Sequence, residues 1–356
     1  MTETPQNSST VPSKILHVYT PFSARRRTPG TAPYSQRQKN RKLTAPSNES
    51  FESVEIFDYS GLLKKTWRLY SLSPLYNFKV NAQSFKKYAR SLDASLTEDK
   101  CSFASSNGGS ERSSFTVYKG LKFNADDPEA VQIQVTEKRN GGGSTIVLNA
   151  LMFCVDIGDH PVPAAHKAHF TYYPVIMITG NKLRSNVVLN WLERHFDCHT
   201  SPLTFSNNDL RWILACCSTR DAGHKAAPVL LQYTLQNVCE GIKTIDCRFE
   251  STFCRELWQR IQNTSLSSLT TLKEDDVETF VGALESHLEY TMHIVFSKLT
   301  LSEVGTPIAY VSSQGKIKLF QSEDIYLPLH LVSSIANDKL TQFSLTQTKP
   351  VLNTTG

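Results

Sequence analysis

The pattern of hydrophobic and polar residues changes near residue 56 of this 356-residue chain. Residues 1–55 are rich in Ser, Thr, Pro and basic residues and show no apolar periodicity. Such a segment buries too little apolar surface to offset the entropy lost on ordering, so we expect a disordered tail. From residue 56 onward apolar residues recur at regular spacings, which predicts a folded body over residues 56–340 and a polar tail over 341–356.

Apolar residues spaced three and four apart predict helices. The first would open the folded body and end at Ser73-Pro74, because proline disfavours the helical conformation in the residue before it. Ser206 and Asp209 stand at the spacing of a capping box, so they would begin a later helix. The expected helices comprise residues 62–72, 83–96, 186–196, 206–217, 252–261 and 274–290.

Runs rich in β-branched and aromatic residues predict strands. Residues 130–138 and 144–157 are joined by a short Gly-rich link, which is typical of an antiparallel hairpin. Strands in groups and helices in pairs indicate an α+β fold, with helices packed on a mostly antiparallel, curved β-sheet and a disordered basic tail in front. The expected strands comprise residues 115–123, 130–138, 144–157, 170–178, 228–235, 242–249, 292–301, 306–312 and 316–321.

Charge is distributed unevenly, although the formal net charge is only +5. Residues 1–50 hold eight basic and two acidic residues, which gives +6, whereas the remaining 306 residues hold 30 basic and 31 acidic ones, which gives −1. The positive charge therefore belongs to the tail. A basic patch on the folded body would require lysines and arginines to cluster in space.

The basic residues of the tail form two clusters, which indicate a nuclear import signal or a loose nucleic-acid contact. A solvated tail without a partner is the alternative. Thr20 and Thr28 each precede proline and are candidate phosphorylation sites, and a phosphate of about −1.5 to −2 charges at Thr28 would partly cancel the neighbouring arginines. The basic residues are Arg25, Arg26, Arg27, Arg37, Lys39, Arg41 and Lys42.

No catalytic or metal-binding motif stands out in the sequence. We therefore expect that the protein is not an enzyme and binds neither a cofactor nor a metal. His195 and His199 lie four apart, as helical metal ligands can, but Ser201-Pro202 would end the helix and no third ligand is evident, so ordinary histidines are favoured. The eight cysteines include no C-x-x-C pair, which favours free thiols in the core. The four tryptophans fall on apolar faces, so core packing is favoured over base stacking. The first ten residues are polar, and the longest apolar run is too short for a membrane helix.

Three blocks of the chain resemble the centromere protein L family of the vertebrate inner kinetochore. The first is LLKKTWRLYSLSPLYNF at residues 62–78. The second is Phe196-Asp197-Cys198 followed by Ser201-Pro202-Leu203 and then Leu210 and Trp212. The third is Gly315-Lys316-Ile317-Lys318. The blocks stand in the family's order, and His195 and His199 are not part of its pattern.

The resemblance implies a non-enzymatic subunit of the constitutive centromere-associated network, in the nucleus at the centromere and kinetochore. Family members form a heterodimer with centromere protein N through their C-terminal regions, here about residues 226–335. The pair helps bind the centromeric nucleosome and its linker DNA, contacts centromere protein C and the neighbouring four-subunit kinetochore module, and supports chromosome segregation in mitosis. A stand-alone nuclear nucleic-acid-binding protein is the alternative.

Two kinds of candidate site follow. The hairpin of residues 306–320 could present an edge to a partner's strand, or both of its strands could be interior. Lys138 and Arg139 at another hairpin tip, and Lys316 and Lys318 on one strand face, are candidate phosphate contacts or ordinary solvated charges. Because the body is almost neutral, we expect weak DNA binding by the chain alone. The candidate partner contacts are Thr306, Ile308, Tyr310, Ile317 and Leu319.

Overall fold

The computed structural model describes residues 14–19, 57–102, 110–122, 127–138, 143–155, 168–218, 227–235, 241–264 and 273–347. The chain divides into two compact units, which are described separately. Unit 1 comprises residues 1–47 and 210–307, and unit 2 comprises residues 48–209 and 308–356. The basic clusters of the tail, Thr20, Thr28 and Arg139 lie outside the described residues.

Unit 2 is built on an antiparallel sheet. Its strands lie in the order β13 (Ala309–Ser312), β14 (Lys316–Leu319), β2 (Thr66–Leu72), β8 (Val175–Gly180), β6 (Ser144–Phe153), β5 (Ala130–Lys138) and β4 (Glu111–Tyr118). The short strand β9 (Thr200–Pro202) also pairs with β2. A separate small sheet joins β3 (Leu75–Tyr76) to β7 (Phe170–Thr171). The expected hairpin of β5 and β6 is confirmed.

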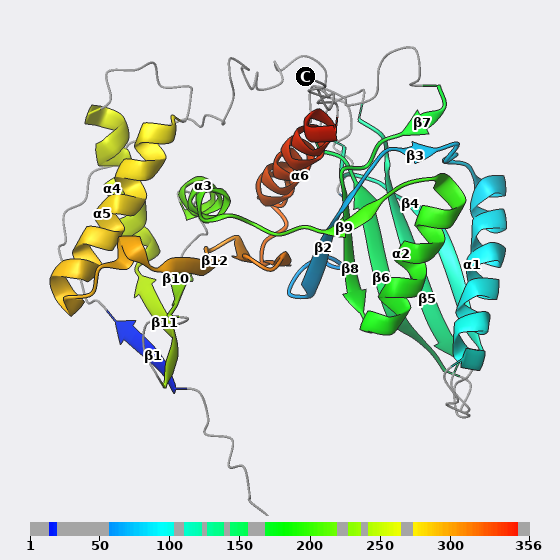
Figure 1. The fold of residues 1–356 in the computed structure, drawn as a ribbon, viewed down its shortest axis with the longest axis horizontal. Coiled ribbons are helices and arrows are strands. Elements are labelled where there is room, and N and C mark those ends of the chain that lie inside the picture. Colours follow the sequence, from blue (N-terminus) through cyan, green and yellow to red (C-terminus); the bar gives the residue numbers. More distant parts are fainter. Residues whose placement is uncertain are drawn as a thin grey trace, which may run out of the picture. The chain divides into compact units, whose positions relative to one another are not determined.

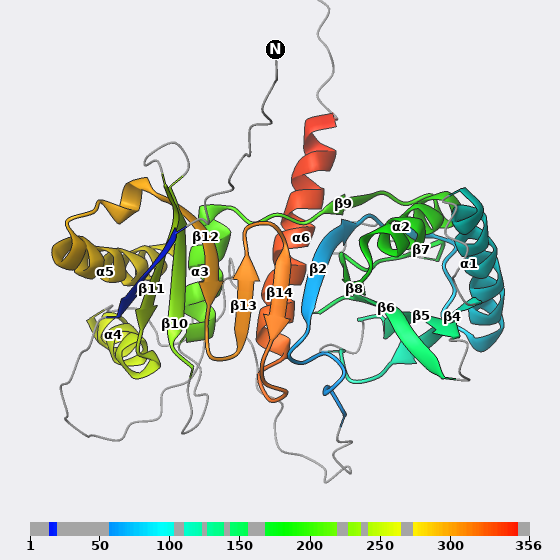
Figure 2. The same ribbon diagram turned by 90° about the horizontal axis from the view of Figure 1, so that it is seen from below.

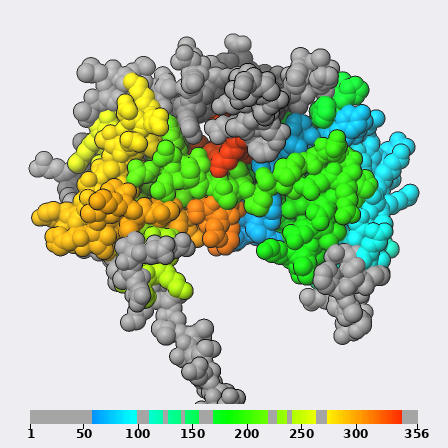
Figure 3. Space-filling model, in the orientation of Figure 1, coloured from blue at the N-terminus to red at the C-terminus, as the bar shows by residue number. Residues whose placement is uncertain are grey.

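Two helices cover one face of this sheet. Helices α1 (Ala82–Ser102) and α2 (Lys182–Phe196) lie beside each other over the strands (Figure 1), and their outer surfaces adjoin in the space-filling view, in cyan and green (Figure 3). Their buried residues, among them Leu92 and Trp191, join Ile133 and Ile176 of the sheet in one hydrophobic cluster. Residues that alternate with these, such as Leu151 and Met177, are also fully buried. Helix α6 (Tyr326–Gln347) contacts β8.

Unit 1 combines a smaller sheet with helices. Its sheet contains β1 (Lys14–Tyr19), β11 (Ile242–Phe249), β10 (Val229–Thr234) and β12 (Thr300–Gly305), and β1 alone is parallel to its neighbour. Helices α3 (Asn207–Ser218), α4 (Ser251–Thr264) and α5 (Glu274–Met292) contribute the buried residues Leu214, Trp258 and Phe280. The mixture of helices and mostly antiparallel strands in both units confirms the α+β fold.

The predicted opening helix is wrong, because residues 66–72 form strand β2. The helical spacing of Leu63, Trp67 and Tyr70 is accidental: Trp67 and Leu69 alternate along a strand and are 0% and 2% exposed. β2 pairs with β14 on one side and β8 on the other, and from Thr66 to Leu69 buried residues alternate with more exposed ones, as in a strand. Ser73-Pro74 ends this strand instead of ending a helix.

Elsewhere the expected elements differ mainly at their ends. The capping box is confirmed: the Ser206 N–H donates to Asp209 Oδ2 (2.8 Å) and the Asp209 N–H donates to Ser206 Oγ (3.2 Å) at the start of α3. The strand expected at residues 292–301 is a correction, since α5 extends to Met292, a 3-10 helix covers Phe296–Lys298 and β12 begins at Thr300. Among the described helices, none combines the length and apolarity that crossing a membrane requires.

Candidate nucleic-acid and partner surface

The blocks that resemble one family meet at strand β2 in unit 2. The Leu69 N–H donates to the Gly315 carbonyl (2.8 Å), and the Leu203 N–H donates to the Leu69 carbonyl (3.0 Å). Figure 2 shows β13, β14 and β2 side by side. The main chain of one residue, Leu69, therefore links all three blocks, which lie far apart in the sequence. These residues connect strands in the middle of the sheet. Their shared pattern is therefore explained by the fold, without any binding role.

Gly315 is required at the turn between β13 and β14. Its φ is +72°, in the left-handed region that favours glycine. A Cβ built on Gly315 would overlap the Leu203 carbonyl oxygen. The turn can therefore approach β2 and the segment after β9 only because the residue has no side chain.

The candidate edge hairpin needs a correction, because β14 is an interior strand. On one side it pairs with β13, with Val311 opposite Ile317, and on the other side it pairs with β2, with Ile317 opposite Trp67. Both rows of main-chain hydrogen-bonding groups on β14 are thus engaged within unit 2. An added strand would have no groups to pair with there.

The side chains chosen as partner contacts are mostly buried. Ile317 and Leu319 are 0% exposed and Ile308 is 1% exposed, so these three contribute to the core of unit 2. Thr306, in unit 1, is 2% exposed. Tyr310 is half-buried on β13. A partner could reach this hairpin only through the more exposed face of its strands.

That face of β14 is basic. Lys316 is exposed and Lys318 is half-buried, while Ile317 between them is buried, so the expected alternation of the two lysines on one face is confirmed. Directly opposite Lys316 on β2 stands Arg68, on the same face. We call Arg68, Lys316 and Lys318 the β14 basic face. Sequence reasoning missed Arg68 because the helix predicted for its segment hid the strand pairing.

The charges of the β14 basic face are held by defined contacts. Arg68 Nη2 donates to the Gly180 carbonyl and to Ser185 Oγ, each at 2.9 Å, which fixes the guanidinium beside the first turn of α2. The Lys318 ammonium lies 5.6 Å from the centroid of the Phe320 ring, a cation–π geometry. Lys316 is the most exposed of the three residues. Such an array suits phosphate contact without base recognition.

The other expected phosphate contacts lie elsewhere. Lys138 is the exposed last residue of β5, and β2, β8 and β6 separate its strand from β14. At a spacing of about 4.8 Å between strands, this separation is about 19 Å. Lys64, which sequence reasoning did not select, is exposed and donates its N–H to the Leu319 carbonyl (2.8 Å), next to Lys318.

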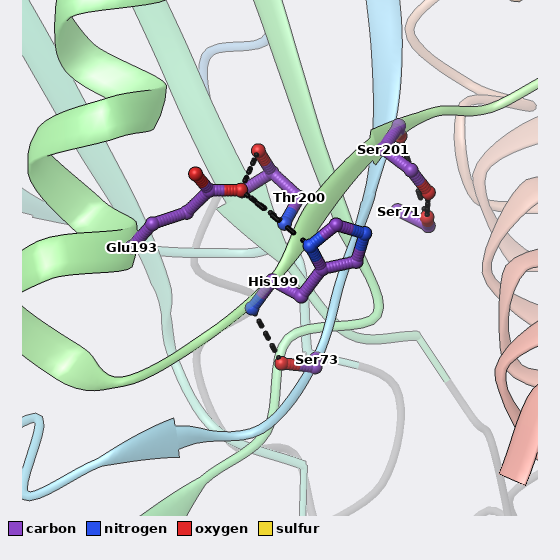
Figure 4. Close-up of polar contacts among 6 residues, drawn as sticks. All are labelled: Ser71, Ser73, Glu193, His199, Thr200 and Ser201. Carbon is purple, nitrogen blue, oxygen red and sulfur yellow. Dashed lines mark hydrogen bonds and ion pairs between the residues drawn. The ribbon is translucent and has the colours of Figure 1, made fainter. Parts of the chain in front are cut away.

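The two histidines at helical spacing do not converge on one site. His199 lies after the end of α2, where its Nδ1 is 3.8 Å from Glu193 Oε1 and its side chain is 73% exposed. The same Glu193 oxygen accepts hydrogen bonds from the Thr200 N–H (2.7 Å) and hydroxyl (2.8 Å), and the His199 N–H donates to Ser73 Oγ (Figure 4). This carboxylate fastens β9 to α2.

His195 points to a different neighbour. Its Nε2 is hydrogen-bonded to Ser91 Oγ (2.8 Å), and its ring stacks on Trp191 at 4.7 Å between centroids. Within the part of the chain that the structure describes, no group of three His, Cys, Asp or Glu residues could hold a metal ion. His195 therefore packs between α1 and α2, whereas His199 is a surface residue beside Glu193.

The described thiols and indoles belong to the core, as expected. Six cysteines are buried: Cys154, Cys198, Cys216, Cys217, Cys247 and Cys254. Burial raises the pKa of Cys198, Cys247 and Cys254 to about 12, which keeps these thiols protonated and unreactive. Trp67, Trp191, Trp212 and Trp258 are at most 5% exposed, which confirms core packing.

Comparisons with known proteins all point to one family. A family model described as centromere protein L matches residues 61–349. Centromere protein L of Homo sapiens is 26% identical over 276 residues, covering 75% of this chain and 77% of the relative. The protein of that name from Bos taurus is 26% identical over 291 residues (80% of each chain), and that from Xenopus tropicalis is 25% identical over 321 residues (88% of each chain).

Proposed function

The chain belongs to the centromere protein L family, and from this premise we propose that it is a non-enzymatic subunit of the constitutive centromere-associated network. Family membership makes it a centromere and kinetochore protein of the nucleus. The observation that carries the proposal is the extent of the family match, residues 61–349, which spans both compact units. In this proposal the chain helps to assemble the network, so its functional features are surfaces that bind other subunits and not a catalytic cleft.

The proposed principal partner is centromere protein N, bound through residues in the range 226–335. Because β14 is interior, we transfer the proposed contact from the hairpin to the end of α5. Tyr290 in the last turn of α5 is 85% exposed, and Val295 just beyond the helix is 49% exposed. Exposed aromatic and aliphatic side chains so close in sequence supply the apolar area that anchors protein interfaces.

Affinity measurements with paired variants test this contact. The full chain would be titrated against the C-terminal region of centromere protein N from the same species, as parent and as Tyr290→Asp. We expect at least a tenfold loss of affinity for Tyr290→Asp. Leu183→Asp on α2 of unit 2 is the matched control, since Leu183 is also apolar and 58% exposed. No binding by the parent would refute the partner, and equal affinities of the two variants would refute the site.

We further propose that the complex of the two proteins holds nucleosomal linker DNA and that the β14 basic face contributes phosphate contacts. The arrangement of Arg68, Lys316 and Lys318 on one face supports this role. Removing one such interaction with a phosphate should reduce the salt slope of log K by about 0.9. The isolated chain should bind DNA weakly, which separates this proposal from a stand-alone nucleic-acid-binding protein.

The DNA proposal is tested on the complex with Lys316→Glu and Lys318→Glu combined. Lys86→Glu with Lys87→Glu, two exposed residues of α1, makes the same change in net charge and is the control. We expect the β14 variant to lower affinity several-fold more than the control and to flatten the salt dependence. Identical losses would show that only the net charge matters. Contacts with centromere protein C and the four-subunit kinetochore module complete the proposed assembly.

A further inference from the structure

Strand β11 in unit 1 is paired along both of its sides, but in two different ways. On one side β10 runs antiparallel to it, from Val229 opposite Phe249 to Thr234 opposite Thr244. On the other side β1 runs parallel to it (Figure 1), from Lys14 opposite Ile242 to Tyr19 opposite Arg248. β10 and β11 are joined by a short connection, whereas more than 200 residues separate β1 from β11 in the chain. The outer side of β11 is therefore occupied by a segment remote in sequence.

The central part of this pairing places residues of like character opposite each other. Leu16 and Val18 stand opposite Ile245 and Cys247, which are buried at 2% and 0% exposure. His17 stands opposite Asp246, whose carboxylate also accepts a hydrogen bond from Gln232 on β10 (2.7 Å). At these three positions residues of like character stand opposite each other. At the two ends of β1 they do not, since Ile15 and Tyr19 stand opposite Thr244 and Arg248, and the register shifts between Lys14 and Ile15.

The pairing that attaches β1 to β11 is nevertheless weak. In the described part of the chain β1 is paired only with β11, through one parallel ladder of six residues, and parallel pairing is slightly less stable per residue than antiparallel pairing. Residues 20–56, 37 in number, connect β1 to the body. Because β1 and β11 belong to the same chain, a released β1 would stay at a high local concentration near β11 and could pair with it again.

An edge of unit 2 shows the other way in which this protein covers a strand. β4 pairs with β5, and α1 lies along its outer side: the Ser113 N–H donates to Asp93 Oδ1 (2.5 Å) and the Ser113 hydroxyl donates to the Ala89 carbonyl (2.9 Å). A helix of the folded body therefore covers that edge. β11 has a tethered strand in the corresponding role.

We propose that Lys14–Tyr19 is a detachable strand that guards the outer edge of β11. Exposed strand edges recruit other strands, so a removable guard both protects the edge and makes its exposure controllable. The docking site is the row of outward main-chain groups from Ile242 to Phe249, and its occupant in this chain is the N-terminal segment. This assignment does not depend on any partner named above.

Hydrogen exchange of the full chain tests the proposal. Leu16→Pro with His17→Pro removes the N–H from two successive residues, one of which must face β11 in any strand. We expect exchange of the outward-facing β11 amides to accelerate at least tenfold, while the β11 amides that face β10 keep their protection as an internal reference. Ser35→Pro with Gln36→Pro, in the same tail but outside β1, is the matched control and should change nothing on β11.

A peptide in trans completes the experiment. A synthetic peptide of residues 12–21 should restore the protection of β11 in the proline variant, and the reversed sequence should not. If the proline variant loses protection throughout the chain, Leu16→Lys with Val18→Lys replaces it, because these changes leave the backbone unaltered. Unchanged exchange of β11 in a folded variant, or equal restoration by both peptides, would overturn the proposal.

Discussion

Replacing Gly315 by alanine tests how the centre of unit 2 is held together. Placing a side chain at φ +72° costs about 1–2 kcal/mol by itself. The added Cβ would also overlap the Leu203 carbonyl, so the turn must move away from β2. That movement strains two hydrogen bonds, Leu69 N–H to Gly315 O and Leu203 N–H to Leu69 O, each worth about 1 kcal/mol. We therefore expect Gly315→Ala to lower the stability of unit 2 by about 3–4 kcal/mol.

Native-state hydrogen exchange in β2 and β14 measures this loss directly, because it reports the free energy of opening for each strand. Two alanine variants separate the contributions. Gly241→Ala has the strained backbone alone, since its φ is +93° and nothing lies within 4 Å of an added Cβ, and it should cost about 1–2 kcal/mol in β11. Gly61→Ala has neither feature and should change little in β2. A Gly315→Ala cost no larger than that of Gly241→Ala would refute the contact with Leu203.

Three further predictions concern single contacts. Tyr233→Phe should destabilise unit 1 by about 1–3 kcal/mol in urea unfolding, because the buried Glu285 loses the hydrogen bond from the Tyr233 hydroxyl (3.0 Å) and keeps its ion pair with Arg211. Tyr290→Phe, at an exposed site, should change nothing. Ser206→Ala should cost about 0.5–2 kcal/mol by removing half of the capping box, and unchanged stability would contradict its role. Burial raises the pKa of Cys198, Cys247 and Cys254 to about 12, whereas an unfolded thiol has a pKa of about 8.5. The stability that these thiols contribute should therefore be fully present below about pH 8.5 and should fall as the pH rises from there toward 12. A free energy of unfolding that stays constant across about pH 8.5–12 would contradict this prediction.

The sequence predicted well those features that depend on neighbours in the chain. The capping box of Ser206 and Asp209 and the hairpin of β5 and β6 are set by residues only a few positions apart, so their patterns are local. The burial of the tryptophans and thiols was also predictable, because residues on the apolar face of an element are buried whichever element they pack against.

Features set by distant pairing were not predictable from one sequence. Trp67 and Leu69 could satisfy a helical or a strand pattern, and only the pairing of β2 with β8 and β14 decides between them. The same pairing makes β14 interior and brings Arg68 opposite Lys316, which a search for basic runs does not find. Nor did the six residues of β1 stand out within a polar tail, since their partner lies more than 200 residues away.

Localisation of the tagged full-length chain in dividing cells of its own species tests the central claim most directly. A subunit of the inner kinetochore should appear as paired foci that coincide with the centromeric histone on every chromosome throughout mitosis. We expect Tyr290→Asp to disperse these foci and Leu183→Asp to leave them intact. A diffuse signal for the parent chain, expressed at its normal level and correctly folded, would contradict the assignment to the centromere.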